Sequence, residues 1–215
     1  MEKVQLLLRQ HVGAPCAPCV AVGDKVKKGT LIATPTGLGA NIFSSVYGEV
    51  SEILEDRIVI KADAEQPDEF VPIDVPEDAS KLDMIKAAGI VGMGGAGFPT
   101  GIKLNIDLSA TEQGEFREDI NPELPKDFKL EHSYILINDS ECEPGLAHNI
   151  KQTIEQTDKV IRGVKYCMEI TKADKAIFAI KKKNREAVLA LLDALKDEEN
   201  ISVHLLPDIY PMGEE

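Results

Sequence analysis

Aromatic and basic side chains are both scarce in this chain. It has no tryptophan, and its 215 residues include 4 Tyr and 6 Phe. Only a few Phe and Tyr side chains are therefore available to stack on the planar ring of a ligand. Lys and Arg total 24 against 37 Asp and Glu, which gives a formal net charge of −13. Such a charge, with no basic stripe to offset it, repels nucleic acid and anionic lipid, and we exclude a nucleic-acid-binding function.

Long hydrophobic runs are also absent. No apolar run approaches the roughly 20 residues that a membrane-spanning helix needs. Residues 1–10 contain a short apolar patch but lack the long apolar region and cleavage site of a signal peptide. We expect a cytoplasmic protein without direct membrane insertion, and peripheral attachment at the inner face of the membrane remains open.

Cysteine is too sparse for a disulfide framework, with thiols only at positions 16, 19, 142 and 167. This spacing also does not offer the four thiolates of a [4Fe–4S] centre, and the histidines show no metal-ligand spacing, so we predict no metal site. Cys16 and Cys19 form a lone CxxC pair. It is interpreted as a redox pair, as half of a metal site, or as neither.

Short β-prone runs dominate the first 75 residues. The turn dipeptide Gly23-Asp24 and several further glycines separate runs such as residues 30–33 and 57–60. The segments 22–29 and 44–50 resemble the barrel-sandwich fold of biotinyl and lipoyl carriers. Those carriers present a modified lysine at a hairpin tip, but the corresponding residues 34–41 contain no lysine. The fold is expected here without the carrier function.

An acidic segment with three prolines, residues 63–80, predicts a linker. A capping-box pattern at Ser80 and Asp83 then predicts a short helix that Gly89 closes. We therefore expect two domains, a barrel-sandwich hybrid domain at 1–76 and an α/β domain at 77–215.

Apolar runs alternate with helical spacing in the second half. Residues 134–137, 176–180 and 203–206 predict buried strands, and apolar residues recur at helical spacing over 150–168 and 188–195. This order predicts a Rossmann-like parallel sheet. Residues 105–132 are polar and acidic, and we interpret them as an exposed insertion.

The glycine-rich segment 92–100, GMGGAGFPT, carries the strongest functional signal. Gly92, Gly94 and Gly97 match the G-x-G-x-x-G pattern, but a predicted helix precedes them, whereas a Rossmann fingerprint follows a strand. Glycines without side chains also let backbone amides converge on a phosphate. A conventional NAD-binding loop and a mobile surface loop are the alternatives to such a phosphate cradle.

Three separated motifs carry a family resemblance. Residues 92–103 look like the FMN loop of the complex I 51 kDa flavoprotein subunit and of the Rnf electron-transport complex C subunit. Residues 138–145 are similar to the acidic second motif of both families, and residues 210–215 to their third flavin motif. Residues 10–15, QHVGAP, resemble the Rnf C subunit and its soluble relatives, and the electron-transfer proteins associated with D-proline reductase fit most closely.

The resemblance implies a set of site residues, none of them catalytic. The domain at 77–215 is then an FMN/NADH-binding domain. The residues expected to bind FMN are Gly92, Gly94, Gly95, Gly97, Lys103, Asn138, Glu141, Tyr210, Gly213 and Glu214. Those expected to bind NADH are Phe98, Glu141 and Glu215. Two positions depart from the complex I pattern. Ile106 stands where an aromatic residue follows the loop lysine, and Ser140 stands where an aspartate belongs.

The implied function is that of an electron-transfer flavoprotein. FMN accepts hydride from NADH and passes electrons to [4Fe–4S] clusters beyond Glu215, toward a reductase or an Rnf-type complex. Because the sequence ends inside the third motif, we expect a fragment that is not competent alone. The alternative is a non-catalytic docking module of an electron-transfer complex that holds no flavin.

Overall fold

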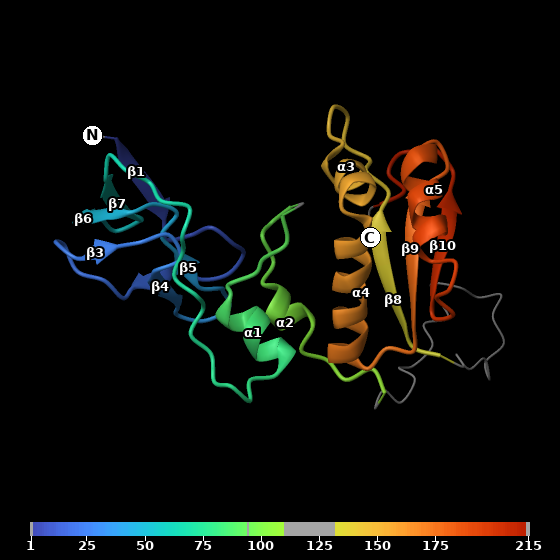
Figure 1. The fold of residues 1–215 in the computed structure, drawn as a ribbon, viewed down its shortest axis with the longest axis horizontal. Coiled ribbons are helices and arrows are strands. Elements are labelled where there is room, and N and C mark those ends of the chain that lie inside the picture. The colour runs from blue at the N-terminus through green and yellow to red at the C-terminus, as the bar shows by residue number, and fades with distance from the viewer. Residues whose placement is uncertain (1, 94, 110–131, 214–215) are drawn as a thin grey trace. The chain divides into compact units, whose positions relative to one another are not determined.

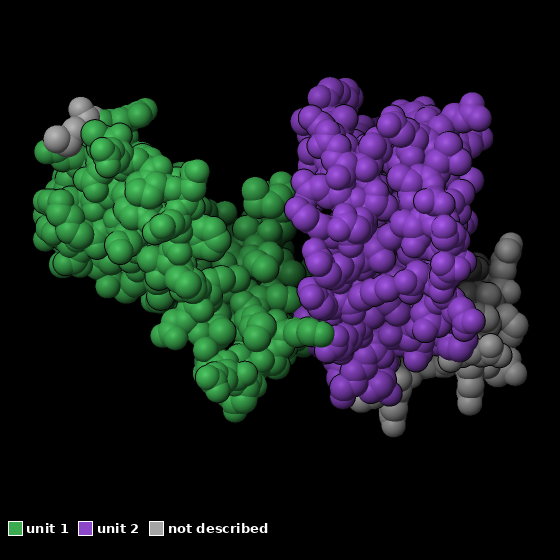
Figure 2. Space-filling model, viewed as in Figure 1, with its two compact units in different colours: residues 1–105 green, residues 106–215 purple. Residues whose placement is uncertain are grey.

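The computed structural model describes residues 2–93, 95–109 and 132–213. The chain divides into two compact units, Met1–Asn105 and Ile106–Glu215, which are named unit 1 and unit 2 and coloured separately in Figure 2.

Unit 1 contains a sandwich of two antiparallel sheets (Figure 1). The first sheet has the strand order β1-β7-β6-β3, with bounds Lys3–Leu7, Arg57–Ala62, Gly48–Ile53 and Lys25–Val26. The second has the order β2-β4-β5, with bounds Cys16–Pro18, Leu31–Pro35 and Ile42–Phe43. Branched side chains fill the space between the sheets, and those of Ile32, Val50, Ile58 and Ile60 are fully buried. The expected barrel-sandwich module is confirmed.

The acidic segment after the sandwich contains no helix or strand before Lys81. It is tied to the sandwich by the Val71 amide, which donates to the Lys28 carbonyl oxygen at 2.8 Å. Helix α1 (Lys81–Ala87) then begins at the expected capping box, in which the Ser80 hydroxyl accepts from the Asp83 amide. Gly89 follows the helix with φ 63°, as expected for a left-handed cap.

Helix α1, the glycine loop and helix α2 (Thr100–Lys103) all belong to unit 1. The Asn41 side-chain amide donates to the Ala87 carbonyl oxygen at 3.0 Å, and a β-carbon on Gly89 would lie 2.3 Å from the Asn41 carbonyl oxygen. These contacts attach α1 to the sandwich. The compact units therefore divide after Asn105, whereas composition places the domain boundary at residues 76 and 77.

Unit 2 is built on three parallel strands in the order β10-β9-β8, with bounds Ile201–Leu206, Lys175–Lys181 and Tyr134–Asp139. Helices α3 (His148–Glu155) and α4 (Thr157–Thr171) connect β8 to β9, and α5 (Arg185–Ala194) connects β9 to β10. The predicted alternation of parallel strands and helices is confirmed.

One face of this sheet carries the core of unit 2. Phe178, Ile180 and Leu191 are fully buried between the sheet and the helices. The apolar run of β8 predicts burial throughout, but its side chains alternate: Ile135 and Ile137 pack on the core, whereas Leu136 is 71% exposed. In the described part of the chain, helices cover only one face of β8, so its outward side chains keep contact with solvent.

Candidate functional site

The glycine loop of unit 1 has a closed neck. The Gly92 amide donates to the Phe98 carbonyl oxygen at 2.9 Å, and the Thr100 amide donates to the Ile90 carbonyl oxygen at 2.9 Å. Beyond this neck the described residues of the loop are exposed except for Gly97, and Met93 is 88% exposed. Gly97 has φ 68°, a left-handed conformation that favours glycine.

Three successive amides of the loop are available to a ligand. A β-carbon on Gly95 would meet no atom within 4 Å, so the backbone there borders open space. Within the described residues, the amides of Gly95, Ala96 and Gly97 have no hydrogen-bond acceptor. Successive amides of this kind can form an anion-binding concavity. Gly94, also assigned to FMN, lies outside the described residues.

Phe98 and Lys103 are both exposed next to the loop. Phe98 is 41% exposed, so part of its ring is open to stacking by a planar group. Lys103 ends helix α2 and lies on the surface of unit 1. Ile106, where the complex I pattern has an aromatic residue, is exposed in unit 2.

In unit 2 the second and third motifs are in contact through Asn138 and Gly213. The Asn138 amide nitrogen donates to the Gly213 carbonyl oxygen at 2.7 Å, and its amide oxygen accepts from the Ser140 hydroxyl at 2.7 Å. A β-carbon on Gly213 would lie 2.1 Å from the Ser140 Oγ, so only glycine fits there. Tyr210, in the same segment, is largely exposed.

Glu141 has a backbone φ of 30°, an uncommon value for a residue with a side chain. Its carboxylate is buried and accepts from the Asn149 amide at 2.9 Å, with His148 Nδ1 at 3.3 Å. Both partners lie in the first turn of α3, where a carboxylate satisfies free amides. The structure thus places Glu141, assigned to flavin and ribose, in contact with α3.

A cavity of ≈ 380 Å³ opens beside the second motif. It lies at the carboxyl ends of β8 and β9, where open α/β sheets bind their ligands. A cavity of this size is large enough for part of a nucleotide. Its lining comprises Glu141, Cys142, Glu143, Pro144, Gly145, Leu146, Ala147, Ile150, Lys183 and Asn184.

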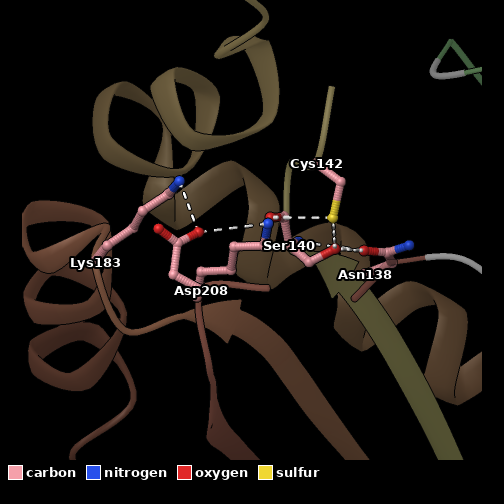
Figure 3. A network of polar contacts seen from close by, with 6 residues as sticks. Asn138, Ser140, Cys142, Lys183 and Asp208 are labelled. Carbon is pink, nitrogen blue, oxygen red and sulfur yellow. Dashed lines mark hydrogen bonds and ion pairs between the residues drawn. The ribbon is translucent and has the colours of Figure 1, made fainter. Parts of the chain in front are cut away.

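The sequence does not single out two lysines that lie near this edge of the sheet. Lys181 is 3% exposed at the end of β9, and its Nζ lies 3.7 Å from an Asp208 carboxylate oxygen. Lys183 pairs with the same carboxylate at 2.8 Å (Figure 3). The apolar run of residues 176–180 does not indicate that the lysine after it is buried.

The Cys142 thiol lies in the same network. Its partial burial raises the pKa, but the Ser140 hydroxyl, the Gly213 backbone amide and the Lys181 ammonium together outweigh that effect and leave the pKa lowered. These contacts therefore stabilise the thiolate of Cys142 relative to that of an unperturbed cysteine.

Asp139 is a buried carboxyl group directly before this network. The Thr153 hydroxyl donates to its Oδ2 at 2.9 Å. Desolvation by burial raises the pKa of Asp139 to about 6, and the charge of Glu141 adds to the rise, while the bond from Thr153 opposes it. No sequence pattern distinguishes this aspartate from an exposed one.

The expected site residues thus fall in both units. Unit 1 carries Gly92, Gly95, Gly97, Phe98 and Lys103. Unit 2 carries Asn138, Glu141, Tyr210 and Gly213, of which Asn138 and Gly213 are in direct contact. Glu214 and Glu215 lie outside the described residues.

The described residues contain neither a metal cluster nor a membrane span. No three His, Cys, Asp or Glu side chains gather among them as a set able to hold a metal ion. None of the described helices combines the length and apolar character needed to cross a membrane. Cys16 and Cys19 are both free, the first buried and the second exposed.

The fold defines a class of two-part proteins, in which a barrel-sandwich module precedes an α/β unit built on parallel strands. Residues 85–215 match the model of the Nuo51 FMN-binding domain, and residues 1–71 match that of the RnfC barrel sandwich hybrid domain. The chain belongs to the family that carries the Nuo51 FMN-binding domain, in the domain arrangement of RnfC.

Curated relatives agree with this assignment. The chain is 34% identical to the C subunit of the proton-translocating ferredoxin:NAD(+) oxidoreductase complex of Clostridium ljungdahlii, over 100% of this chain and 46% of that protein. It is 30% identical to the C subunit of the Na(+)-translocating complex of Acetobacterium woodii, over 100% and 47%. It is 35% identical to the cobalamin reductase PduS of Salmonella typhimurium, over 61% and 23%. The chain spans less than half the length of these relatives.

Proposed function

We propose that this chain is the FMN-binding part of an electron-transfer flavoprotein that oxidises NADH. In the full-length protein, FMN would take a hydride from NADH and release electrons to [4Fe–4S] centres beyond residue 215. An Rnf-type membrane complex or a reductase, such as one for D-proline, would receive them. Association with such a complex would place the protein at the inner face of the membrane.

The observation that carries this proposal is the contact between Asn138 and Gly213. It joins two segments that resemble separate flavin motifs, next to the carboxyl end of β8. The match to an FMN-binding domain over residues 85–215 supports the identity of the cofactor.

Each part of the chain has a proposed role toward FMN. The bare amides of Gly95, Ala96 and Gly97 would bind a phosphate. Lys103 and the buried Lys181 would supply positive charge, which stabilises a reduced, anionic flavin. Asn138 would orient the third motif, and the exposed ring of Phe98 would stack on the adenine of NADH.

Flavin titration tests the cofactor assignment. The purified chain is titrated against FMN and against riboflavin, which lacks the phosphate, and flavin fluorescence is recorded. Tight FMN binding with riboflavin weaker by at least about tenfold, on the order of 1.4 kcal/mol, supports a phosphate cradle. A protein that binds neither flavin supports the alternative, a non-catalytic docking module.

Anaerobic reduction tests the donor. NADH is added to the FMN-loaded full-length protein, and bleaching of the flavin absorbance is followed with NADPH as the matched control. Phe98→Leu should raise the NADH concentration needed for half-maximal rate, because an aliphatic side chain stacks less well on adenine. No bleaching with NADH would contradict the donor assignment without affecting the FMN assignment.

A further inference from the structure

His11 is buried beneath the glycine loop of unit 1. Its Nδ1 lies 3.0 Å from the Val12 carbonyl oxygen, and its Nε2 lies 3.2 Å from the Ala40 backbone amide nitrogen. Because a carbonyl oxygen only accepts and an amide only donates, these two contacts require the neutral ring with its proton on Nδ1. The Nε2 atom is therefore an acceptor, and the Cys16 Sγ is 3.4 Å away from it.

This ring holds the hairpin tip of residues 34–41, the segment that bears lysine in carriers. A β-carbon on Gly39 would lie 2.6 Å from His11 Cε1, so the tip packs directly on the imidazole. The Ala14 amide donates to the Leu38 carbonyl oxygen at 3.1 Å, which closes the tip onto residues 10–15. The tip is thus attached to residues 10–15 through Leu38 and Gly39, whereas a carrier needs a free tip.

The glycine loop rests on the same residues. A β-carbon on Gly97 would lie 3.0 Å from the Gln10 carbonyl oxygen and 3.1 Å from His11 Cα. Gly97 is buried and has φ 68°, whereas Gly95 borders open space. The backbone of Gln10 and His11 is therefore the floor of the loop.

We propose that His11 is a positioning residue, which fixes this floor by accepting the Ala40 amide and so holds the amides around Gly97 in their phosphate-binding arrangement. The inference rests on the proposed FMN function for its consequence in binding. On this inference, the barrel-sandwich module of this chain supports the glycine loop. A supporting residue of this kind sets how well the cofactor-contacting groups are preorganised.

Two substitutions of His11 distinguish the role of its hydrogen-bond acceptor from the role of its ring volume. Gln has an amide oxygen that can reach the place of Nε2, so His11→Gln keeps an acceptor for Ala40. His11→Phe keeps a ring of similar volume but leaves the buried Ala40 amide without an acceptor. Val50→Ala is the matched control, because it removes buried volume from the sandwich core at β6 and no contact with His11 or the glycine loop is described.

FMN affinity is measured on the whole chain at a temperature at which every variant is folded. We expect His11→Phe to weaken FMN binding by roughly tenfold or more, His11→Gln by no more than about threefold, and Val50→Ala by no more than about twofold. Equal weakening by His11→Phe and Val50→Ala, or wild-type affinity in folded His11→Phe, would overturn the inference.

Amide hydrogen exchange at Gly97 and Phe98 provides a readout that needs no flavin. Exchange should be faster in His11→Phe than in Val50→Ala, and close to wild type in His11→Gln. A chain that binds no FMN but shows this pattern contradicts the proposed function and retains the positioning role. Unchanged exchange in His11→Phe contradicts the positioning role itself.

Discussion

The side-chain amide of Asn138 donates to the carbonyl oxygen of Gly213 across 2.7 Å and thereby joins segments 75 residues apart. Ser140 completes the contact, since its hydroxyl bonds to the Asn138 amide oxygen and lies where a Gly213 β-carbon would be. The second and third motifs are therefore joined into one surface by Asn138 and Ser140.

Gly213→Ala should disrupt this surface. The added methyl group would lie 2.1 Å from the Ser140 Oγ, so the third motif must move away. We expect faster amide exchange at Met212 and an FMN dissociation constant raised at least about tenfold. A substitution that leaves both unchanged would show that Asn138 and Gly213 do not organise the site.

Gly163→Ala is the matched control within unit 2. Gly163 is exposed in the middle of α4, and its β-carbon would meet no atom within 4 Å. Alanine should stabilise the helix by about 0.5–1 kcal/mol because it loses less backbone entropy on folding. Thermal unfolding should register this gain while FMN affinity stays unchanged.

Gly95→Ala and Gly97→Ala should have different effects in unit 1. A methyl group at Gly95 enters open space, so the folded chain should keep its stability while FMN binding weakens by roughly tenfold. A methyl group at Gly97 meets the Gln10 carbonyl oxygen at φ 68°, so both stability and FMN binding should fall. Thermal unfolding and flavin titration separate the two outcomes. Unimpaired FMN binding by Gly95→Ala would argue against a phosphate at that position.

Local signals made much of this fold predictable. The capping box at Ser80, the left-handed Gly89 and the alternation of apolar runs with helical spacing all depend on neighbours in the chain, and all are confirmed. The exposure of Leu136 was not predictable, because an uninterrupted apolar run does not reveal that only one face of a strand is covered.

The parts of the site that were missed depend on distant contacts. The burial of Lys181 and Asp139, and the packing of His11 under Gly97, arise between segments far apart in the sequence. The division after Asn105 has the same origin, since α1 is attached to the sandwich through Asn41. The composition of an acidic segment with prolines indicates a linker. It does not indicate whether the helix that follows packs on the preceding or the following unit.

Asp139→Asn should stabilise unit 2 above pH 6. The pKa of Asp139 is about 6 in the folded chain and 3.8 as its ordinary value, so the folded state binds the proton more tightly. Stability from this group is fully present below about pH 4 and is lost as pH rises through 6. Asparagine keeps an acceptor for Thr153 and carries no charge, so its advantage should grow over this window and reach up to about 3 kcal/mol.

Amide exchange at the buried Phe178, corrected for the intrinsic rate at each pH, measures this stability in unit 2. The difference between Asp139→Asn and the wild type should be small at pH 4 and constant above pH 7. A difference that does not vary with pH would mean that Asp139 keeps its ordinary pKa in the folded chain.

Cys142 should be the most reactive thiol at neutral pH. The Ser140 hydroxyl, the Gly213 amide and the Lys181 ammonium lower its pKa against the effect of burial, whereas burial raises the pKa of Cys19 even though Cys19 is exposed. Since the thiolate is the nucleophile, iodoacetamide should alkylate Cys142 faster than Cys19 at pH 7.5, as measured by mass spectrometry of peptides.

Two lysine variants test the source of this reactivity. Lys181→Met keeps a long side chain in the buried position but removes the charge, and should slow alkylation of Cys142 by several-fold, roughly up to tenfold, while Cys19 is unaffected. Lys183→Met also removes a partner of Asp208, but Lys183 makes no described contact with the Cys142 thiol, so it should change the rate by no more than about twofold. Equal slowing by both variants would point to the net charge of the region, and no slowing by Lys181→Met would assign the low pKa to Ser140 and the Gly213 amide alone.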